Sequence, residues 1–266
     1  MRNASNSSVT MTQEAIQNEK GVLYGLLVVL CSGLCFQVLN KLLDCGGIPK
    51  SAEGQKWRWK NILISFIHAC ISGSWSLYSF YDNPKMLEDL MWTHNNVSYT
   101  LISMTVGYTI YDCIDMLIYQ RGRQTYELLV HHAVIIICFG IAIMSYIYVG
   151  YACLALMVEL NSAFLHLRQL LQILGFKKDN STYRLNSLVN LGTYIVFRIA
   201  TLAWMTRWLV INKDLIPFVV YTCGSIGLAV MTIMNIVLFY RLLRSDFFVK
   251  QRPRNIKECD PLLKQQ

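Results

Sequence analysis

The sequence predicts an all-α fold, a polytopic membrane bundle of six to seven transmembrane helices. Of 266 residues, 54% are hydrophobic and only 15% are charged, which is more apolar surface than one soluble core of this length needs. The mean hydropathy of +0.37 agrees. A helix needs about 20 apolar residues to cross the ~30 Å hydrocarbon layer. Seven runs of about this length occur, at residues 21–43, 61–81, 97–119, 126–144, 147–173, 187–209 and 216–240.

The first run is expected to be a signal anchor. Cleaved signal peptides begin with a short basic region, whereas about twenty mostly polar residues precede this run. A cleaved signal peptide is the alternative. The chain therefore divides into an extracellular or luminal tail (1–20), a first transmembrane helix (21–44), a domain formed by the remaining helices (50–247) and a cytosolic basic tail (248–266).

The division between the fourth and fifth runs depends on length alone. From Tyr126 to Leu174 the chain has no strong cluster of charges, yet it is roughly twice as long as one crossing. A tight turn is therefore expected near Ser145 to Val149.

Basic residues predict the orientation, because cytoplasmic loops carry an excess of Lys and Arg. With the N-terminus outside, 17 basic residues face the cytosol and 5 face the opposite side, while Arg168 and Arg198 lie within spans. The net charge of +8 then requires no nucleic-acid partner. The basic segment beginning at Arg241 either enforces this orientation or contacts anionic lipid headgroups. The sequons at Asn3, Asn6 and Asn96 fall outside, which predicts a glycoprotein.

Ionisable residues inside the spans are the candidates for function. His131 and His132 are adjacent in an otherwise apolar run, Asp112 and Asp115 lie in the third run, and Glu159 lies in the fifth. Such residues are costly in a bilayer and usually face the interior of the bundle. At a rise of 1.5 Å per residue, most of these residues lie in the cytosolic half of the membrane. We expect one polar chamber that opens toward the inner leaflet.

Spacing within the helices supports this convergence. Asp112 and Asp115 are three residues apart and share a helix face, while Glu159, Ser162 and His166 form a second stripe. Adjacent residues on a helix point about 100° apart. Only one histidine of the pair is therefore expected to point squarely inward, and its neighbour should touch an adjacent helix.

Two chemical interpretations of these residues remain open. They are either fasteners that hydrogen-bond between helices, or a catalytic group in which His131 or His132 is a general base with Asp112, Asp115 or Glu159 as its carboxylate. Acyl transfer between lipids fits the second interpretation. A di-iron desaturase needs a larger histidine set than the five present here, so we expect no metal and no cofactor.

Several segments, in this order, resemble the TLC-domain membrane proteins, the family that includes the ceramide synthases. The resemblance covers roughly residues 50–247 and is closest to the branch of TLC domain-containing proteins one and two. The segments that carry it are Trp57-Arg-Trp-Lys-Asn-Ile-Leu-Ile-Ser-Phe-Ile-His68, Gly107-Tyr-Thr-Ile-Tyr-Asp-Cys-Ile-Asp115, Tyr126-Glu-Leu-Leu-Val-His-His132, Val158-Glu-Leu-Asn-Ser-Ala-Phe-Leu165 and Arg241-Leu-Leu-Arg-Ser-Asp-Phe247.

The resemblance implies a regulator of membrane phospholipid composition and fluidity. Members of this branch limit the incorporation of phospholipids that contain polyunsaturated fatty acids, which promotes membrane rigidity. Membrane lipids and their acyl chains are the implied partners, with lipid-remodelling enzymes as further candidates. Ceramide synthases carry a His-Asp pair and a further Asp one helix after the paired histidines, whereas this chain has Glu159-Leu-Asn-Ser162 there. A non-enzymatic role is therefore favoured.

Two alternative functions remain. One is an acyl-CoA-dependent acyltransferase of the ceramide synthase type, acting on a lipid amine or hydroxyl. The other is a channel or transporter subunit, although no internal repeat or pair of broken helices is evident. An acidic dileucine pattern at Glu258-Cys-Asp-Pro-Leu-Leu263 and the lack of a terminal retention signal favour the plasma membrane, with the endoplasmic reticulum as the alternative.

Overall fold

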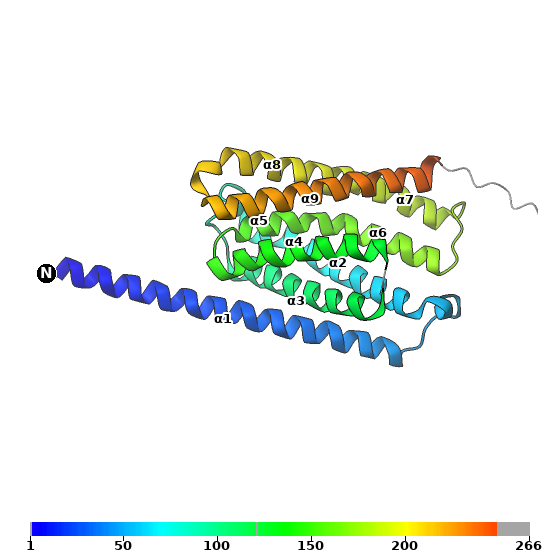
Figure 1. The fold of residues 1–266 in the computed structure, drawn as a ribbon, viewed down its shortest axis with the longest axis horizontal. Helices are drawn as coiled ribbons and strands as arrows, with labels where there is room; N and C mark the ends of the chain where they lie inside the picture. The colour runs from blue at the N-terminus through cyan, green and yellow to red at the C-terminus, as the bar shows by residue number, and fades with distance from the viewer. Residues whose placement is uncertain (1, 121, 249–266) are drawn as a thin grey trace, which may run out of the picture.

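Long helices, nearly parallel or antiparallel to one another, build the bundle (Figure 1). The computed structural model describes residues 2–120 and 122–248. The basic tail and its dileucine pattern therefore lie outside the described residues, apart from Phe248. The main helices are α1 (Arg2–Cys45), α2 (Lys56–Asp82), α3 (Asn96–Tyr119), α4 (Arg123–Ser145), α5 (Val149–Ala155), α6 (Glu159–Ile173), α7 (Ser181–Tyr194), α8 (Thr201–Ile211) and α9 (Phe218–Leu243).

Short helical turns complete or connect these helices. The 3₁₀ turns are η1 (Lys50–Gln55), η2 (Pro84–Leu87), η3 (Leu156–Val158) and η5 (Lys213–Leu215), and the π-helical turns are η4 (Ile195–Ala200) and η6 (Arg244–Phe248). Because η3 joins α5 to α6 and η4 joins α7 to α8, each pair forms one continuous crossing.

Seven segments of the described chain are long and apolar enough to span a membrane, as predicted. They are Glu19–Cys45, Lys50–Asp82, Asn96–Tyr119, Thr125–Ser145, Val149–Ile173, Ser181–Ile211 and Phe218–Phe248.

The predicted turn between the fourth and fifth spans is present. The chain reverses at Tyr146 and Tyr148, which adopt left-handed φ angles of 60° and 66°. The Tyr148 amide donates to the Met91 carbonyl at 2.7 Å, so the turn is held against the loop that follows α2.

Two other helix ends have recognisable caps. Gly175, with φ of 84°, ends α6. The Asn95 side chain caps the start of α3 by accepting from Ser98 N.

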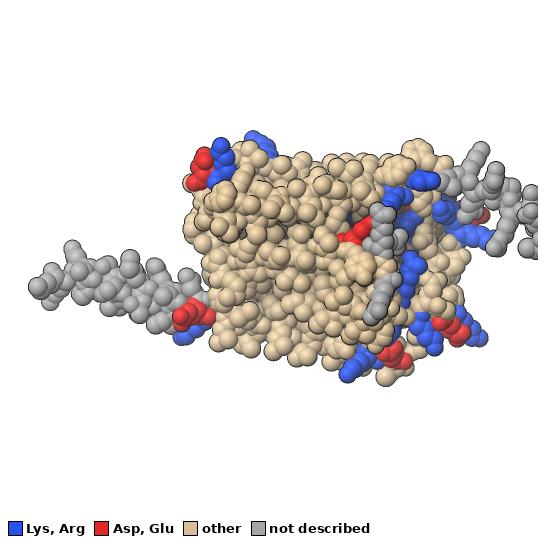
Figure 2. Space-filling view, in the orientation of Figure 1, with Lys and Arg blue, Asp and Glu red and all other residues tan. Residues whose placement is uncertain are grey.

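The two ends of the bundle differ in charge. We name the end with residues 46–55 and 174–180 the inner end, and the end with residues 83–95 and 146–148 the outer end. Lys and Arg gather at the inner end, and the surface between the ends is almost free of charge (Figure 2). Exposed aromatic side chains mark both levels, as in membrane-interface belts. They are Tyr81, Trp92 and Phe218 at the outer end and Tyr119, Tyr126 and Tyr240 at the inner end.

The interior is divided in the same way. The largest apolar cluster lies in the outer half and includes Phe80, Leu90, Tyr99, Phe139 and Leu154. Buried histidines and carboxylates lie in the inner half, where they were expected.

All eight described cysteines are free thiols. Cys31, Cys35 and Cys70 lie within spans and are exposed on the apolar surface.

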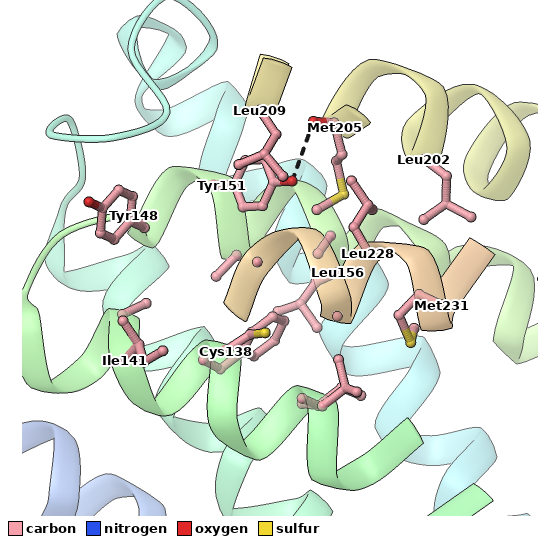
Figure 3. A pocket seen from close by; sticks show the side chains of 18 of the residues that line it. Cys138, Ile141, Tyr148, Tyr151, Leu156, Leu202, Met205, Leu209, Leu228 and Met231 are labelled. Carbon is pink, nitrogen blue, oxygen red and sulfur yellow. Dashed lines mark hydrogen bonds between the residues drawn. The ribbon is translucent and has the colours of Figure 1, made fainter. Parts of the chain in front are cut away.

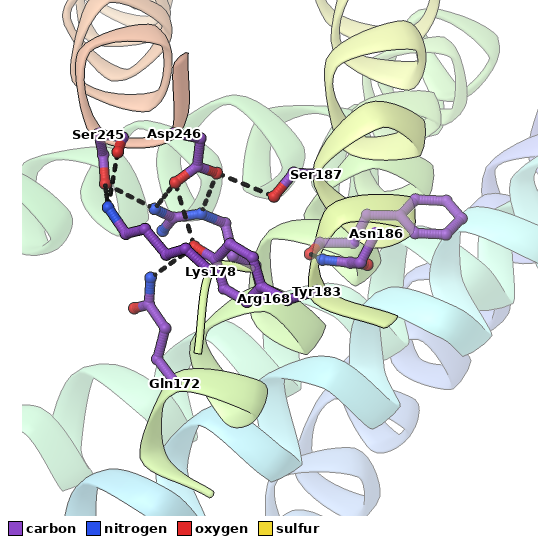
Figure 4. Close-up of polar contacts among 9 residues, drawn as sticks. Arg168, Gln172, Lys178, Tyr183, Asn186, Ser187, Ser245 and Asp246 are labelled. Atoms are coloured by element: carbon purple, nitrogen blue, oxygen red, sulfur yellow. Dashed lines mark hydrogen bonds and ion pairs between the residues drawn. The ribbon is translucent and has the colours of Figure 1, made fainter. Parts of the chain in front are cut away.

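A polar cluster at the inner end joins α6 and α7 to the end of α9 (Figure 4). Arg168 binds Asp246 through two hydrogen bonds, Nε to Oδ2 at 2.7 Å and a terminal nitrogen to Oδ1 at 2.5 Å. Tyr183 and Ser187 of α7 donate to the same carboxylate. Arg168, which the sequence placed inside a span, therefore fastens the C-terminal turn of the bundle.

Candidate functional site

One histidine of the adjacent pair meets a predicted carboxylate. His132 of α4 is buried with its Nε2 3.5 Å from Oδ2 of Asp112 on α3. Asn61 of α2 donates to the other oxygen of Asp112 at 2.6 Å. Three helices thus hold a histidine, a carboxylate and an amide in contact, and the Nδ1 atom of His132 has no partner in the described structure.

Asp115 lies one turn nearer the inner end and has different neighbours. Trp57 Nε1 donates to its Oδ2 at 2.8 Å, and Asn40 of α1 donates to Oδ1 at 3.3 Å. Asn61 also reaches Oδ2 at 3.3 Å. Asp115 therefore links α1, α2 and α3, and the structure does not pair it with a histidine.

His131 points away from its neighbour, as the helical geometry predicts. The two imidazole rings are 5.5 Å apart between centroids and inclined at 54°. His131 Nδ1 lies 3.1 Å from the sulfur of Met231 on α9. The adjacent histidines therefore face different helices.

The second stripe leads to a buried arginine. Ser162 of α6 accepts from Arg198 at 2.7 Å, and Arg198 also donates to the side-chain oxygens of Asn161 at 2.7 Å and Asn235 at 2.6 Å. Arg198 lies in the π-helical turn η4, a feature that is frequent at functional sites. Glu159 lies within electrostatic range of Arg198.

Asn161 and Asn235 were not among the predicted site residues. Each is the one amide in an apolar stretch of its span, and this could have marked both residues as candidates for the polar interior. Asn161 is fully buried and also donates to Asn190 of α7 at 2.8 Å. These amides disperse the arginine charge through hydrogen bonds, since no carboxylate pairs with Arg198 directly among the described ion pairs.

His68 and His166 complete the polar interior. The His68 ring stacks on Tyr108 with centroids 3.7 Å apart, and Tyr108 donates to Ser65 at 2.9 Å. His68 lies within electrostatic range of His132 and His166. Nε2 of His68 and Nδ1 of His166 are buried without a partner in the described structure. The predicted convergence is therefore present, but as linked pairs and networks.

An apolar cavity lies beside these networks, between α4, α5, α8 and α9 (Figure 3). Its volume is about 130 Å³, similar to the ~150 Å³ apolar cavity that stays dry and binds benzene in a well-studied case. His131 and Glu159 lie at one end, and Tyr148 and Ile216 at the other. The cavity therefore extends from the polar residues toward the outer end.

Among residues 2–120 and 122–248, no group of three or more His, Cys, Asp or Glu side chains is placed to hold a metal ion. The arrangement can instead orient an imidazole through Asp112, and it can accept hydrocarbon next to His131.

We expect Asp112→Leu to lower stability by about 2–3 kcal/mol, because Asn61 and His132 would each lose a buried partner. Asp112→Asn keeps the shape and one acceptor oxygen, so its cost should be about 1 kcal/mol or less. Thermal unfolding in detergent measures both. Equal losses for the two variants would show that the hydrogen bonds of Asp112 are not what stabilises this contact.

These features define a class: a multispanning helical membrane protein with a polar interior and an adjoining apolar cavity. A family model described as TLC domain matches residues 58–244, within the predicted domain of 50–247. The chain belongs to the TLC domain family.

Named relatives agree with this membership. The chain is 52% identical to TLC domain-containing protein 2 of Danio rerio over 84% of this chain and 90% of the relative. It is 36% identical to TLC domain-containing protein 2 of Homo sapiens, over 86% of each chain. It is 33% identical to TLC domain-containing protein 1 of Mus musculus over 85% of this chain and 92% of the relative. The predicted resemblance is confirmed.

Proposed function

We propose that this protein regulates membrane phospholipid composition and fluidity. It limits the incorporation of phospholipids that contain polyunsaturated fatty acids, and so promotes membrane rigidity. The observation that carries the proposal is the apolar cavity of about 130 Å³ inside a membrane-spanning bundle. Such a cavity can accept part of an acyl chain, since apolar pockets with few polar groups are the usual form of ligand sites.

The cavity lining suits hydrocarbon. Val134, Cys138, Met205 and Leu228 present carbon and sulfur, while His131 and Glu159 supply polar groups at one end. The expected partners are accordingly membrane lipids and phospholipid acyl chains, together with lipid-remodelling enzymes that would receive or lose the bound chain. The family resemblance gives the direction of the effect on polyunsaturated phospholipids.

A cavity-filling substitution tests the role of the cavity. Gly224 of α9 lines it, and a Cβ there would meet only Leu209 Cδ1, at 3.9 Å. Gly224→Leu should therefore fill the cavity with little strain and abolish the effect on lipids. In cells lacking the gene, we expect wild-type protein to lower the polyunsaturated phospholipid fraction and Gly224→Leu at equal expression to leave it raised.

The matched control is Gly140→Leu on α4. Gly140 is absent from the cavity lining, and a Cβ there would meet nothing within 4 Å. It should rescue like the wild type. If Gly224→Leu also rescues fully, the cavity is not the site of action. If only ceramides respond to deletion, the phospholipid role itself is wrong.

The His132–Asp112 contact favours a second candidate function. A buried imidazole 3.5 Å from a carboxylate has the form of an oriented general base, as an acyltransferase acting on a lipid amine or hydroxyl would require. Rescue with the variant His131→Ala, His132→Ala distinguishes the two. Full rescue would exclude catalysis by these histidines, and a changed ion conductance without a lipid change would favour a channel.

The proposed location is the plasma membrane, with the endoplasmic reticulum as the alternative. The inner end, where Lys and Arg gather, would face the cytosol. Glycans are proposed at Asn3, Asn6 and Asn96 on the opposite side. Asn96 is exposed at the first turn of α3.

A further inference from the structure

The two halves of α9 are held by different forces. In the inner half, Asn235 accepts from Arg198 at 2.6 Å, Arg241 pairs with Glu127 of α4 at 2.9 Å, and the turn after α9 is held by Arg168 through Asp246. Tyr194 of α7 also donates to the Asn235 carbonyl at 2.7 Å. These bonds fix the inner half and the turn after it to α4, α6, α7 and η4.

The outer half of α9 makes mainly apolar contacts. Its Gly227 packs against Cys138 and Val134 of α4, where an added Cβ would lie 3.1 Å from each. Val220 and Leu228 join an apolar cluster that includes Trp208 and Leu209 of α8. Within the described residues, the polar side-chain contact between α4 and α9 that lies nearest this half is that of His131 with Met231, at its inner limit.

The apolar cavity lies directly behind this part of the α4–α9 interface. Cys138 and Val134 on α4 and Gly227 on α9 line the cavity and also make the interface. On the bilayer side, Ile137 of α4 and Ile226 of α9 are 53% and 60% exposed. Each of these two residues is next in sequence to one that lines the cavity, Cys138 or Gly227. The helix α9 lies between α4 and α8 (Figure 1).

Of the interfaces that the outer half of α9 makes with α4 and with α8, the one with α4 is the easier to open. A short connection through η5 and Pro217 ties α8 to α9 at the outer end. By contrast, α4 continues into α5, so no connection ties its outer end to α9. Lipid tails are as apolar as the side chains at this interface, so replacing those contacts with lipid costs little. Opening the inner half would break buried hydrogen bonds.

We propose that an acyl chain enters the cavity sideways from the bilayer, through the interface between α4 and the outer half of α9. We name this interface the α4–α9 portal, formed by Val134, Cys138 and Gly227. The proposal rests on acyl-chain binding in the cavity, which is part of the proposed function. Opening bends α9 between Met231 and Asn235, and the inner half stays in place.

A disulfide across the portal tests this entry route. A Cβ at residue 227 lies 3.1 Å from Cys138 Sγ, so the thiol of Gly227→Cys can approach the ~2 Å bonding distance. Cys223 is replaced by alanine to prevent competing pairs. The protein is placed in phosphatidylcholine vesicles, and a phosphatidylcholine with a photoactivatable acyl chain is then added. Labelling of the cavity residues by light, located by peptide mass spectrometry, reports entry of the chain.

We expect oxidation before lipid addition to lower labelling at least tenfold, and reduction to restore it. The matched control Gly227→Ser has a similar side-chain size and cannot form the disulfide, so oxidation should leave its labelling unchanged. Oxidation after lipid addition should retain the label.

Two results would overturn the proposal in different ways. Equal labelling of oxidised and reduced Gly227→Cys would show that the chain enters by another route, with the proposed binding intact. If the cavity residues are labelled neither in the reduced protein nor in Gly227→Ser, acyl-chain binding itself is refuted, and the portal with it.

Discussion

Replacing Arg198 with methionine should lower the stability of this protein by about 3–5 kcal/mol, the cost of breaking a buried charged network by removing one member. Methionine has similar length but donates no hydrogen bond. The side-chain oxygens of Asn161 and Asn235 and the hydroxyl of Ser162 would each lose a donor at 2.6–2.7 Å. Arg198 is buried and connects α6, η4 and α9, so the loss should loosen all three. Thermal unfolding in detergent measures it.

Two controls separate the network from the loss of charge in general. Arg207→Met removes an exposed arginine on the following helix, and it should change stability by about 0.5 kcal/mol or less. In a double-mutant cycle, Arg198→Met and Asn235→Leu should show a coupling of about 1–3 kcal/mol. If Arg198→Met is as stable as the wild type, the prediction is wrong. That outcome would mean that the methionine side chain compensates for the lost hydrogen bonds, as apolar groups do for some buried charges.

The sequence predicted the spans and their turns because bilayer thickness constrains segment length directly. The reversal at Tyr146 to Tyr148 followed from length alone, since residues 126–174 are too long for one crossing. Depth in the membrane was also predictable from residue count. His132 and Asp112 were both placed in the cytosolic half of their spans, and they are in contact in the structure.

Helix rotation and partner choice could not be predicted in the same way. Asp112 and Asp115 share a face, yet a rise of one turn brings Asp115 to Trp57 and Asn40 instead of a histidine. The partners of Arg198 come from α6 and α9, which are separated in sequence by two helices. The cavity depends on how four helices fail to fill the space between them, and no single helix carries that information.

The substitution Gly107→Ala should separate α1 from the rest of the bundle. A Cβ at this position would overlap the carbonyl oxygen of Val29 and lie 2.8 Å from the Ser32 Cβ and 3.1 Å from the Gly33 nitrogen. Two of these three atoms belong to the backbone of α1 and cannot rotate away. Small residues at such crossings let helix backbones approach closely in membranes.

The expected cost is about 2–3 kcal/mol, at the upper end for overpacking by one methyl group. The hydrogen bond from Ser32 to the Met104 carbonyl, 2.7 Å long, should be lost as the helices move apart. Gly192→Ala is the matched control, because a Cβ there would meet nothing within 4 Å. It makes the same chemical change at an exposed position of α7 and should stabilise by up to about 1 kcal/mol. If thermal unfolding shows that Gly107→Ala destabilises the protein and Gly192→Ala stabilises it, the close α1–α3 crossing is established. If both variants are stabilised, α1 can shift without cost.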